Sequence, residues 1–316
     1  MNASAAGRLC YLHINSPEHV FDQGLKAEAE RVATELTRSG FPLRVEVHHA
    51  LGDEKRQMQQ MEEGRLAQPH PDLFIVIPIN KEDVYTILSQ IVSAREDVTC
   101  VFLHQPLTRM HLAAREDHKG RLFSVSADQK EIGRLQARQF AAMLPDGAGD
   151  VLYVQGRQNS YATAQRMLGL LDEVPRTAGV KVNGQRVFGD WSSGSVKPAL
   201  EGWKQLGGKL EWIQAAGAQN DDMAMGLAAL LTTEGCSVPV IGVDGLEPGR
   251  KAVADGTLAA TVVQPLGVGH ALRLFRDLHV GAREADLIPA DGNVVLPPES
   301  YPTLDKLRTR AMESKA

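Results

Sequence analysis

Side chains with planar polar or aromatic groups recur directly after the short apolar runs of this sequence. They are Asn15, His104, Gln105, Trp191, Asn220, Asp244 and Gln264. Amide and carboxylate groups form paired hydrogen bonds with adjacent hydroxyls, and an indole ring stacks on the apolar face of a sugar ring. Arg166, in a helical stretch that follows residues 151–156, adds a cationic fork. These residue types indicate the binding of a small, hydroxyl-rich molecule.

Each of these residues also has an ordinary structural interpretation, which the sequence leaves open. Asn15 and Asn220 could cap helices, Asp244 could belong to an Asp–Gly turn, and His104 could form a strand-end hydrogen bond. Arg166 could pair with Asp172 or lie in solvent, and Trp191 could pack in the core. Because the interpretations are independent of one another, they do not explain why the whole set falls at the ends of apolar runs. Binding is therefore the favoured interpretation of the set.

Motifs of catalysis and of cofactor or metal binding are missing from the sequence. No predicted strand runs into GxGxxG or GxxxxGKS/T, the glycine-rich loops of nucleotide sites, and no GxSxG nucleophile elbow occurs. The ten histidines form no HExxH pair, and the three cysteines form no CxxC. We therefore expect no enzyme, no cofactor and no metal, and we expect free cysteines that are mostly buried.

Strands and helices that alternate along the chain must position the candidate residues. Apolar runs rich in β-branched residues predict ten strands, and amphipathic stretches such as residues 128–144 predict the helices. The predicted strands are residues 9–14, 43–48, 73–79, 99–104, 122–126, 151–154, 185–188, 212–216, 238–243 and 258–264. This alternation indicates parallel sheets covered on both faces, with ligands bound outside the carboxyl ends of the strands. Ten strands exceed one ordinary sheet, so we expect two lobes.

The composition argues against several kinds of partner. The 316 residues carry 34 Lys or Arg and 39 Asp or Glu, for a formal net charge of −5, so we expect no nucleic acid partner. The longest uncharged stretch, residues 257–272, is shorter and more polar than the ~20 apolar residues that span a bilayer. Residues 1–8 lack the apolar core of a secretory signal. We therefore expect either a cytoplasmic protein or a chain whose signal has been removed.

Three stretches give the chain a resemblance to a known family. They are residues 218–226 (AQNDDMAMG), 240–245 (VIGVDG) and 256–264 (GTLAATVVQ), with support from residues 155–166 and 71–78. The chain resembles the type I periplasmic sugar-binding proteins, the ribose- and galactose-binding group, which shares its fold with lactose-repressor-like effector domains. The resemblance implies an α/β fold of two Rossmann-like, doubly wound parallel-sheet lobes joined by three crossover segments. It assigns residues 1–127 and 265–295 to an N-terminal lobe and residues 128–264 and 296–316 to a C-terminal lobe, with the ligand cleft between them.

The resemblance also implies ligand contacts, position by position. In the C-terminal lobe and hinge they fall on Arg166, Trp191, Asn220, Asp244 and Gln264. In the N-terminal lobe they fall on Asn15, His104 and Gln105, with Phe21 and Ile77 as further candidates. His104 and Gln105 stand where sugar-binding members of the family often have Asp and Arg. We therefore expect a ligand other than simple ribose or galactose.

The function implied by the resemblance is capture of a sugar, polyol or sugar acid by hinge closure, and its delivery to the permease of an ABC importer. A periplasmic location, after removal of a signal peptide, accompanies that function. Two other functions stay open: a sensory binding protein that serves a chemoreceptor or sensor kinase, and the effector-binding domain of a lactose-repressor-like regulator. The regulator requires a helix-turn-helix upstream, and only eight residues precede the first predicted strand.

Overall fold

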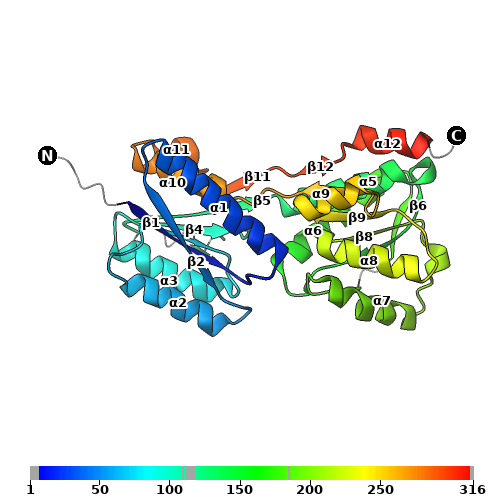
Figure 1. Cartoon of the computed structure of the whole chain (residues 1–316), viewed down its shortest axis with the longest axis horizontal. Coiled ribbons are helices and arrows are strands. Elements are labelled where there is room, and N and C mark those ends of the chain that lie inside the picture. The colour runs from blue at the N-terminus through cyan, green and yellow to red at the C-terminus, as the bar shows by residue number, and fades with distance from the viewer. Residues whose placement is uncertain (1–6, 109, 112–117, 184–185, 314–316) are drawn as a thin grey trace. The chain divides into compact units, whose positions relative to one another are not determined.

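The computed structural model of the chain describes residues 7–108, 110–111, 118–183 and 186–313. The chain divides into two units, and Figure 1 labels most of their helices and strands. Unit 1 comprises Met1–Ala127 and Leu266–Leu296, and unit 2 comprises Asp128–Pro265 and Pro297–Ala316. The chain therefore passes from one unit to the other three times.

Unit 1 is built on a six-stranded sheet in which every neighbouring pair of strands is parallel. In spatial order the strands are β11 (Asn293–Leu296), β5 (Arg121–Ala127), β4 (Thr99–Leu103), β3 (Leu73–Val76), β1 (Arg8–Ile14) and β2 (Leu43–His49). The described helices are α1 (Val20–Arg38), α2 (Glu54–Leu66), α3 (Lys81–Ala94), α10 (Val268–His279) and α11 (Glu284–Leu287).

Apolar side chains cover both faces of the unit 1 sheet. Ile75 of β3 belongs to the cluster that includes buried residues of α1 and α10. Its neighbours Phe74 and Val76 belong to the cluster that includes buried residues of α2 and α3. Successive residues of a strand point to opposite faces, so the two helix pairs cover opposite faces of the sheet. Burial on both faces explains why these strands read as continuous apolar runs.

Unit 2 repeats this plan with one antiparallel edge. In spatial order its strands are β12 (Glu299–Tyr301), β10 (Ala260–Val263), β9 (Val240–Asp244), β8 (Ala215–Ala218), β6 (Gly149–Val154) and β7 (Val180–Asn183), and only the described β10–β12 pair is antiparallel. Its helices are α5 (Gln129–Met143), α6 (Tyr161–Glu173), α7 (Val196–Gln205), α8 (Asp221–Thr233), α9 (Glu247–Ala254) and α12 (Leu304–Glu313). Short 3-10 turns lie at Pro145–Gly147, Val174–Arg176, Ser193–Ser195 and Leu210–Trp212.

The two cores of unit 2 also lie on opposite faces of its sheet. Leu152 of β6 packs in the cluster that includes buried residues of α7, α8 and α9. The next residue, Tyr153, packs in the cluster that includes buried residues of α5, α6 and α12. The prediction of an α/β protein with two doubly wound, mainly parallel sheets is confirmed.

Individual strands differ from the prediction at the edges of the sheets. The strands that were not predicted, β7, β11 and β12, are all edge strands of three or four residues. An edge strand pairs on one side only and is partly exposed, so it needs no continuous apolar run. In the predicted strand 185–188, Gln185 lies outside the described residues, and Phe188 forms a single bridge with Gln155. Trp212 lies in a 3-10 turn, and the strand predicted there begins at Ala215.

Across the described part of the chain, no helix combines the length and the hydropathy that crossing a bilayer requires.

Candidate functional site

Arg166 lies at the centre of a buried polar cluster in unit 2. Its Nε donates to Gln129 Oε1 at 2.8 Å, and its two terminal nitrogens donate to the backbone carbonyl of Gln219 and to Gln264 Oε1. All four residues are 5% exposed or less. Burial lowers the pKa of Arg166, while the nearby Asp244 opposes this shift. A buried cation in such a fork favours anionic or oxygen-rich partners.

Close packing of α5 against α6 brings Arg166 to Gln129. A Cβ at Gly133 would lie 1.9 Å from the Arg166 carbonyl oxygen, and a Cβ at Gly169 would lie 1.8 Å from the Lys130 carbonyl oxygen. Only glycine permits this approach of the two backbones. Arg166 therefore points into the cluster and does not pair with Asp172, which forms a salt bridge with Lys130.

Asp244 ends β9 with its carboxyl 9% exposed. Burial raises the pKa of this carboxyl well above its usual range, Arg166 opposes the rise, and the neighbouring Asp221 adds to it. The backbone of Asp244 has φ +110°, a region that few residues other than glycine occupy. Gln264 lies one residue beyond β10, and its backbone N–H donates to the backbone carbonyl of Asp244 at 3.1 Å.

Asn220 and Trp191 are joined to each other in the same unit. Asn220 Oδ1 accepts from the Met223 amide at 3.0 Å and so caps α8, while its Nδ2 donates to the Trp191 carbonyl at 2.8 Å. The Trp191 ring is half-buried, packs against the core of unit 2 and lies 5.5 Å from the Arg166 guanidinium carbon. The capping interpretation thus describes the contacts of Asn220, and the same amide also anchors the loop that carries Trp191.

Four of the five candidate residues of unit 1 follow strands β1, β3 and β4, which are neighbours in the sheet, and the fifth, Phe21, lies in α1. Asn15 Oδ1 accepts from the Gly52 amide at 2.6 Å, and α1 has its N-cap position at His19, so Asn15 does not cap that helix. Gln105 Nε2 donates to the Pro78 carbonyl at 3.2 Å.

The remaining unit 1 candidates are Phe21, Ile77 and His104. The His104 ring is 9% exposed and meets Phe21 edge-on, with ring centroids 5.2 Å apart. His104 has φ +64°. The side chain of Ile77 packs against the core of unit 1, and its carbonyl accepts from Gln57 Nε2 at 2.9 Å. Parallel strands end at one edge of the sheet, and ligands bind there in open α/β folds.

Three further members of the unit 2 cluster were not predicted: Gln129, Gln219 and Asp221. Gln219 is fully buried and accepts from the Gly156 amide at 3.0 Å. In a sequence, polar residues beside a predicted helix start are interpreted as helix caps or as a solvent-exposed face, so their burial is not predicted.

The backbone is strained at His104, Trp191 and Asp244, which all have positive φ. The sequence contains no signal for this strain. Such strain persists only where surrounding contacts enforce it, and it concentrates at functional sites.

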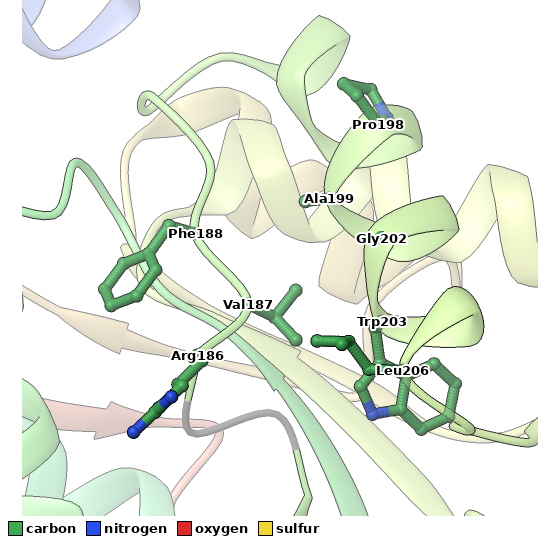
Figure 2. Close-up of a pocket in the computed structure, with 8 residues that line it drawn as sticks. All are labelled: Arg186, Val187, Phe188, Pro198, Ala199, Gly202, Trp203 and Leu206. Atoms are coloured by element: carbon green, nitrogen blue, oxygen red, sulfur yellow. The ribbon is translucent and has the colours of Figure 1, made fainter.

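Figure 2 shows a separate cavity of about 490 Å³ in unit 2, between α7 and residues 186–188. In this view Val187 points toward α7, and Arg186 and Phe188 point away from it. The described lining residues are Arg186, Val187, Phe188, Pro198, Ala199, Gly202, Trp203 and Leu206. The predicted ligand contacts are not among them, so this cavity is distinct from the polar cluster around Arg166.

Among the residues that the structure describes, no group of three or more His, Cys, Asp or Glu side chains is placed to hold a metal ion. Cys10 and Cys100 are free and buried, and Cys236 is free and half-buried.

Comparison with known proteins matches most of the chain to one family. The sequence model of the family described as "Periplasmic binding protein domain" matches residues 13–268. The D-xylose-binding periplasmic protein of Haemophilus influenzae is 24% identical over 226 residues, which cover 71% of this chain and 64% of that protein. The ribose import binding protein RbsB of Salmonella typhimurium is 55% identical over 53 residues, 16% of this chain and 18% of that protein. The chain thus aligns with less than two thirds of either relative.

A solved structure matches nearly the whole chain. It is an ABC transporter periplasmic solute binding protein from Actinobacillus succinogenes with bound D-allose. The TM-score is 0.76 at 17% identity, and the match covers 96% of this chain and 99% of that chain. At this identity the likeness is one of fold.

Proposed function

Because this chain belongs to the family of periplasmic binding protein domains, we propose that it is a solute-binding protein that captures a sugar or a sugar-like small molecule. The observation that carries the proposal is the buried cluster of Arg166, Asp244 and Gln264 beside Trp191 in unit 2. A cationic fork, a carboxylate, an amide and an indole together match the donors, acceptors and apolar face of a sugar ring. We propose that these groups bind the ligand and do not catalyse a reaction.

The proposed ligand contacts divide between two lobes. In the C-terminal lobe, Arg166 and Asp244 form charge-assisted hydrogen bonds with hydroxyls, Trp191 stacks on the ring, and Asn220 and Gln264 add amide contacts. In the N-terminal lobe the contacts are Asn15, His104 and Gln105, with Phe21 and Ile77 as apolar walls. A ligand that reaches both sets only when the lobes close shifts the population toward the closed state. Binding by hinge closure is the mechanism that we propose on this basis.

Transport is the cellular role that we propose for this binding. The xylose-binding relative is a periplasmic protein, and the ribose-binding relative is named for import. By analogy, this chain acts in the periplasm and delivers its ligand to the permease of an ABC importer. Cell fractionation, and ligand uptake by a strain that lacks the gene, test the two parts separately.

A ligand screen tests the binding function directly. The unfolding temperature is measured with D-xylose, D-ribose, D-allose, xylitol, myo-inositol and D-galacturonate, and hits are titrated by calorimetry. Binding to the native state alone stabilises the protein by about 2.7 kcal/mol at a hundredfold excess over the dissociation constant. Asp244→Ala should greatly reduce the shift, and Asp172→Ala, which removes a surface carboxylate bridged to Lys130, should preserve it. A panel without any stabilising member contradicts the proposal.

A further inference from the structure

Asp221, the first residue of α8, has a buried carboxyl group that two donors hold from opposite ends. Its Oδ2 accepts from the Gly245 amide at 2.8 Å, and its Oδ1 accepts from Thr261 Oγ1 at 2.6 Å. Glycines leave the space for both oxygens: a Cβ at Gly242 would lie 2.2 Å from Oδ1, and a Cβ at Gly249 would lie 1.9 Å from Oδ2. The carboxyl therefore ties the start of α8 to β10 and to the turn after β9.

That turn carries Asp244 in a strained backbone conformation. Asp244 and Gly245 have φ +110° and +60° in succession, and only the second residue is a glycine. Contacts on either side hold the turn, because the Gly245 carbonyl accepts from Arg250 Nε at 2.8 Å and the Asp244 carbonyl accepts from the Gln264 amide. A strained non-glycine residue keeps its conformation only where such contacts over-determine it. A third contact also holds the turn: the Gly245 backbone amide donates to the Asp221 carboxylate.

Burial of the Asp221 carboxyl is itself unfavourable. Burial raises its pKa, and the contacts with Thr261 and Gly245 and the charges of Arg166 on α6 and Arg250 on α9 oppose the rise. Asp244 on β9 is the carboxyl next to it, and Asp222 adds negative charge near Asp244. Burying a charged group is costly unless hydrogen bonds or opposite charges compensate for it. One of the compensating bonds comes from the Gly245 backbone amide, in the turn that follows Asp244.

We propose that Asp221 is a positioning residue of the ligand site, whose carboxylate locks the Asp244–Gly245 turn and thereby holds the Asp244 carboxyl beside Arg166. This inference rests on the proposed function only for its effect on ligand affinity. Asp221 acts through Asp244 and does not contact the ligand. Its loss therefore matters only while Asp244 is present to be positioned.

A double-mutant cycle measures that dependence. Asp221→Ala should weaken sugar binding by at least about tenfold, because the turn can then relax. Asp221→Asn should stay within about threefold of wild type, because its Oδ1 can accept from Gly245 while Thr261 accepts from its Nδ2. Asp221→Ala combined with Asp244→Ala should bind no more weakly than Asp244→Ala alone. Additive losses in the double variant overturn the proposal.

A second experiment displaces the Asp221 carboxylate without changing Asp221 itself. In Gly249→Ala the new Cβ would lie 1.9 Å from Asp221 Oδ2 and so drives this oxygen away from the Gly245 amide. Alanine has a higher helix propensity than glycine, so the substitution does not weaken α9 itself. Gly202→Ala in α7 is the matched control, because nothing lies within 4 Å of its Cβ position. Hydrogen exchange of the Gly245 amide, measured by NMR without ligand, should accelerate at least about tenfold in Gly249→Ala and stay unchanged in Gly202→Ala.

The two experiments separate the inference from the proposed function. Failure of the wild-type protein to bind any sugar contradicts the proposed function, while the exchange of the Gly245 amide still reports whether Asp221 locks the turn. Unchanged exchange in both Gly249→Ala and Asp221→Ala overturns the inference, whatever the ligand is.

Discussion

The guanidinium carbon of Arg166 lies 5.5 Å from the ring centroid of Trp191, and Asn220 Nδ2 donates to the Trp191 carbonyl at 2.8 Å. The half-buried indole thus stands beside a buried cation, with its own backbone at φ +79°. A cation beside an indole face gains electrostatic attraction, more so when it is desolvated. The two candidate contacts are therefore one unit of structure, and a change in either is expected to move the other.

The strongest expected losses of affinity come from the two charged residues of the cluster. Arg166→Ala and Asp244→Ala should each weaken ligand binding by roughly 2–4 kcal/mol, because each leaves a charge-assisted partner unpaired in a desolvated site. Calorimetry on folded variants measures the change. Arg176→Ala, which removes an exposed arginine from a salt bridge with Glu173, is the control and should leave affinity unchanged. Wild-type affinity in both cluster variants would exclude this site.

Trp191 should report ligand binding by its fluorescence. Trp191→Ala should weaken binding by about 1–3 kcal/mol through lost apolar area and ring contact. The other two tryptophans, the half-buried Trp203 of α7 and the half-exposed Trp212, are the controls. The fluorescence change should survive Trp203→Phe and Trp212→Phe and should disappear in Trp191→Phe. A signal that persists in Trp191→Phe contradicts stacking on this ring.

His104 should make affinity depend on pH, with a sign that reports the charge of the ligand. Histidine gains a proton between pH 8 and 5, and its protonated ring donates two hydrogen bonds and accepts none. An anionic sugar acid should bind more tightly at pH 5.5 than at pH 8, and a neutral sugar that uses the ring as acceptor should bind more weakly. Calorimetry at pH 5.5 and 8 on wild type and His104→Gln separates these cases. Equal pH profiles for the two proteins would remove His104 from the site.

His13 should make the protein less stable in acid. Its ring is fully buried between His48 and Phe74, and burial, with the nearby His48, lowers its pKa to about 3. The unfolded state therefore binds the proton first, and stability falls as the pH drops below the unfolded value of about 6.5. This linkage amounts to roughly 1–2 kcal/mol at pH 5. Urea unfolding at pH 7.5 and 5 should show a smaller loss in His13→Phe than in wild type.

A change in the same ring stack without a titratable group provides the control for His13. Phe74→Leu should lower stability by a similar amount at both pH values, because no proton is involved. An acid loss in His13→Phe equal to that of wild type would assign the effect to other groups.

The fold was predictable because most of its strands are covered on both faces. Such strands, for example β3 and β4, are continuous apolar runs, which the chain displays locally. The edge strands β7, β11 and β12 escaped prediction because each has only three or four residues and pairs with one neighbour, which is too short for a periodic pattern, whereas the seven-residue edge strand β2 was predicted. Trp212 shows the same limit, since its apolar ring suggested a strand where the backbone forms a 3-10 turn.

The candidate site was predictable only in part, as a set of positions after strands. That Asp244 and Gln264 follow neighbouring strands can be expected from the order of elements, because parallel strands end at the same edge of a sheet. Other parts of the site depend on hydrogen bonds between residues far apart in the chain. These bonds run from Arg166 to Gln129 and Gln219, and from the Gly245 amide to Asp221. In our proposal, the bond from Gly245 to Asp221 holds Asp244 at its positive φ. Residue type and local pattern determined where polar groups stand, whereas tertiary packing decided which of them are buried together, because burial and non-local hydrogen bonds exist only once the helices and sheet have assembled.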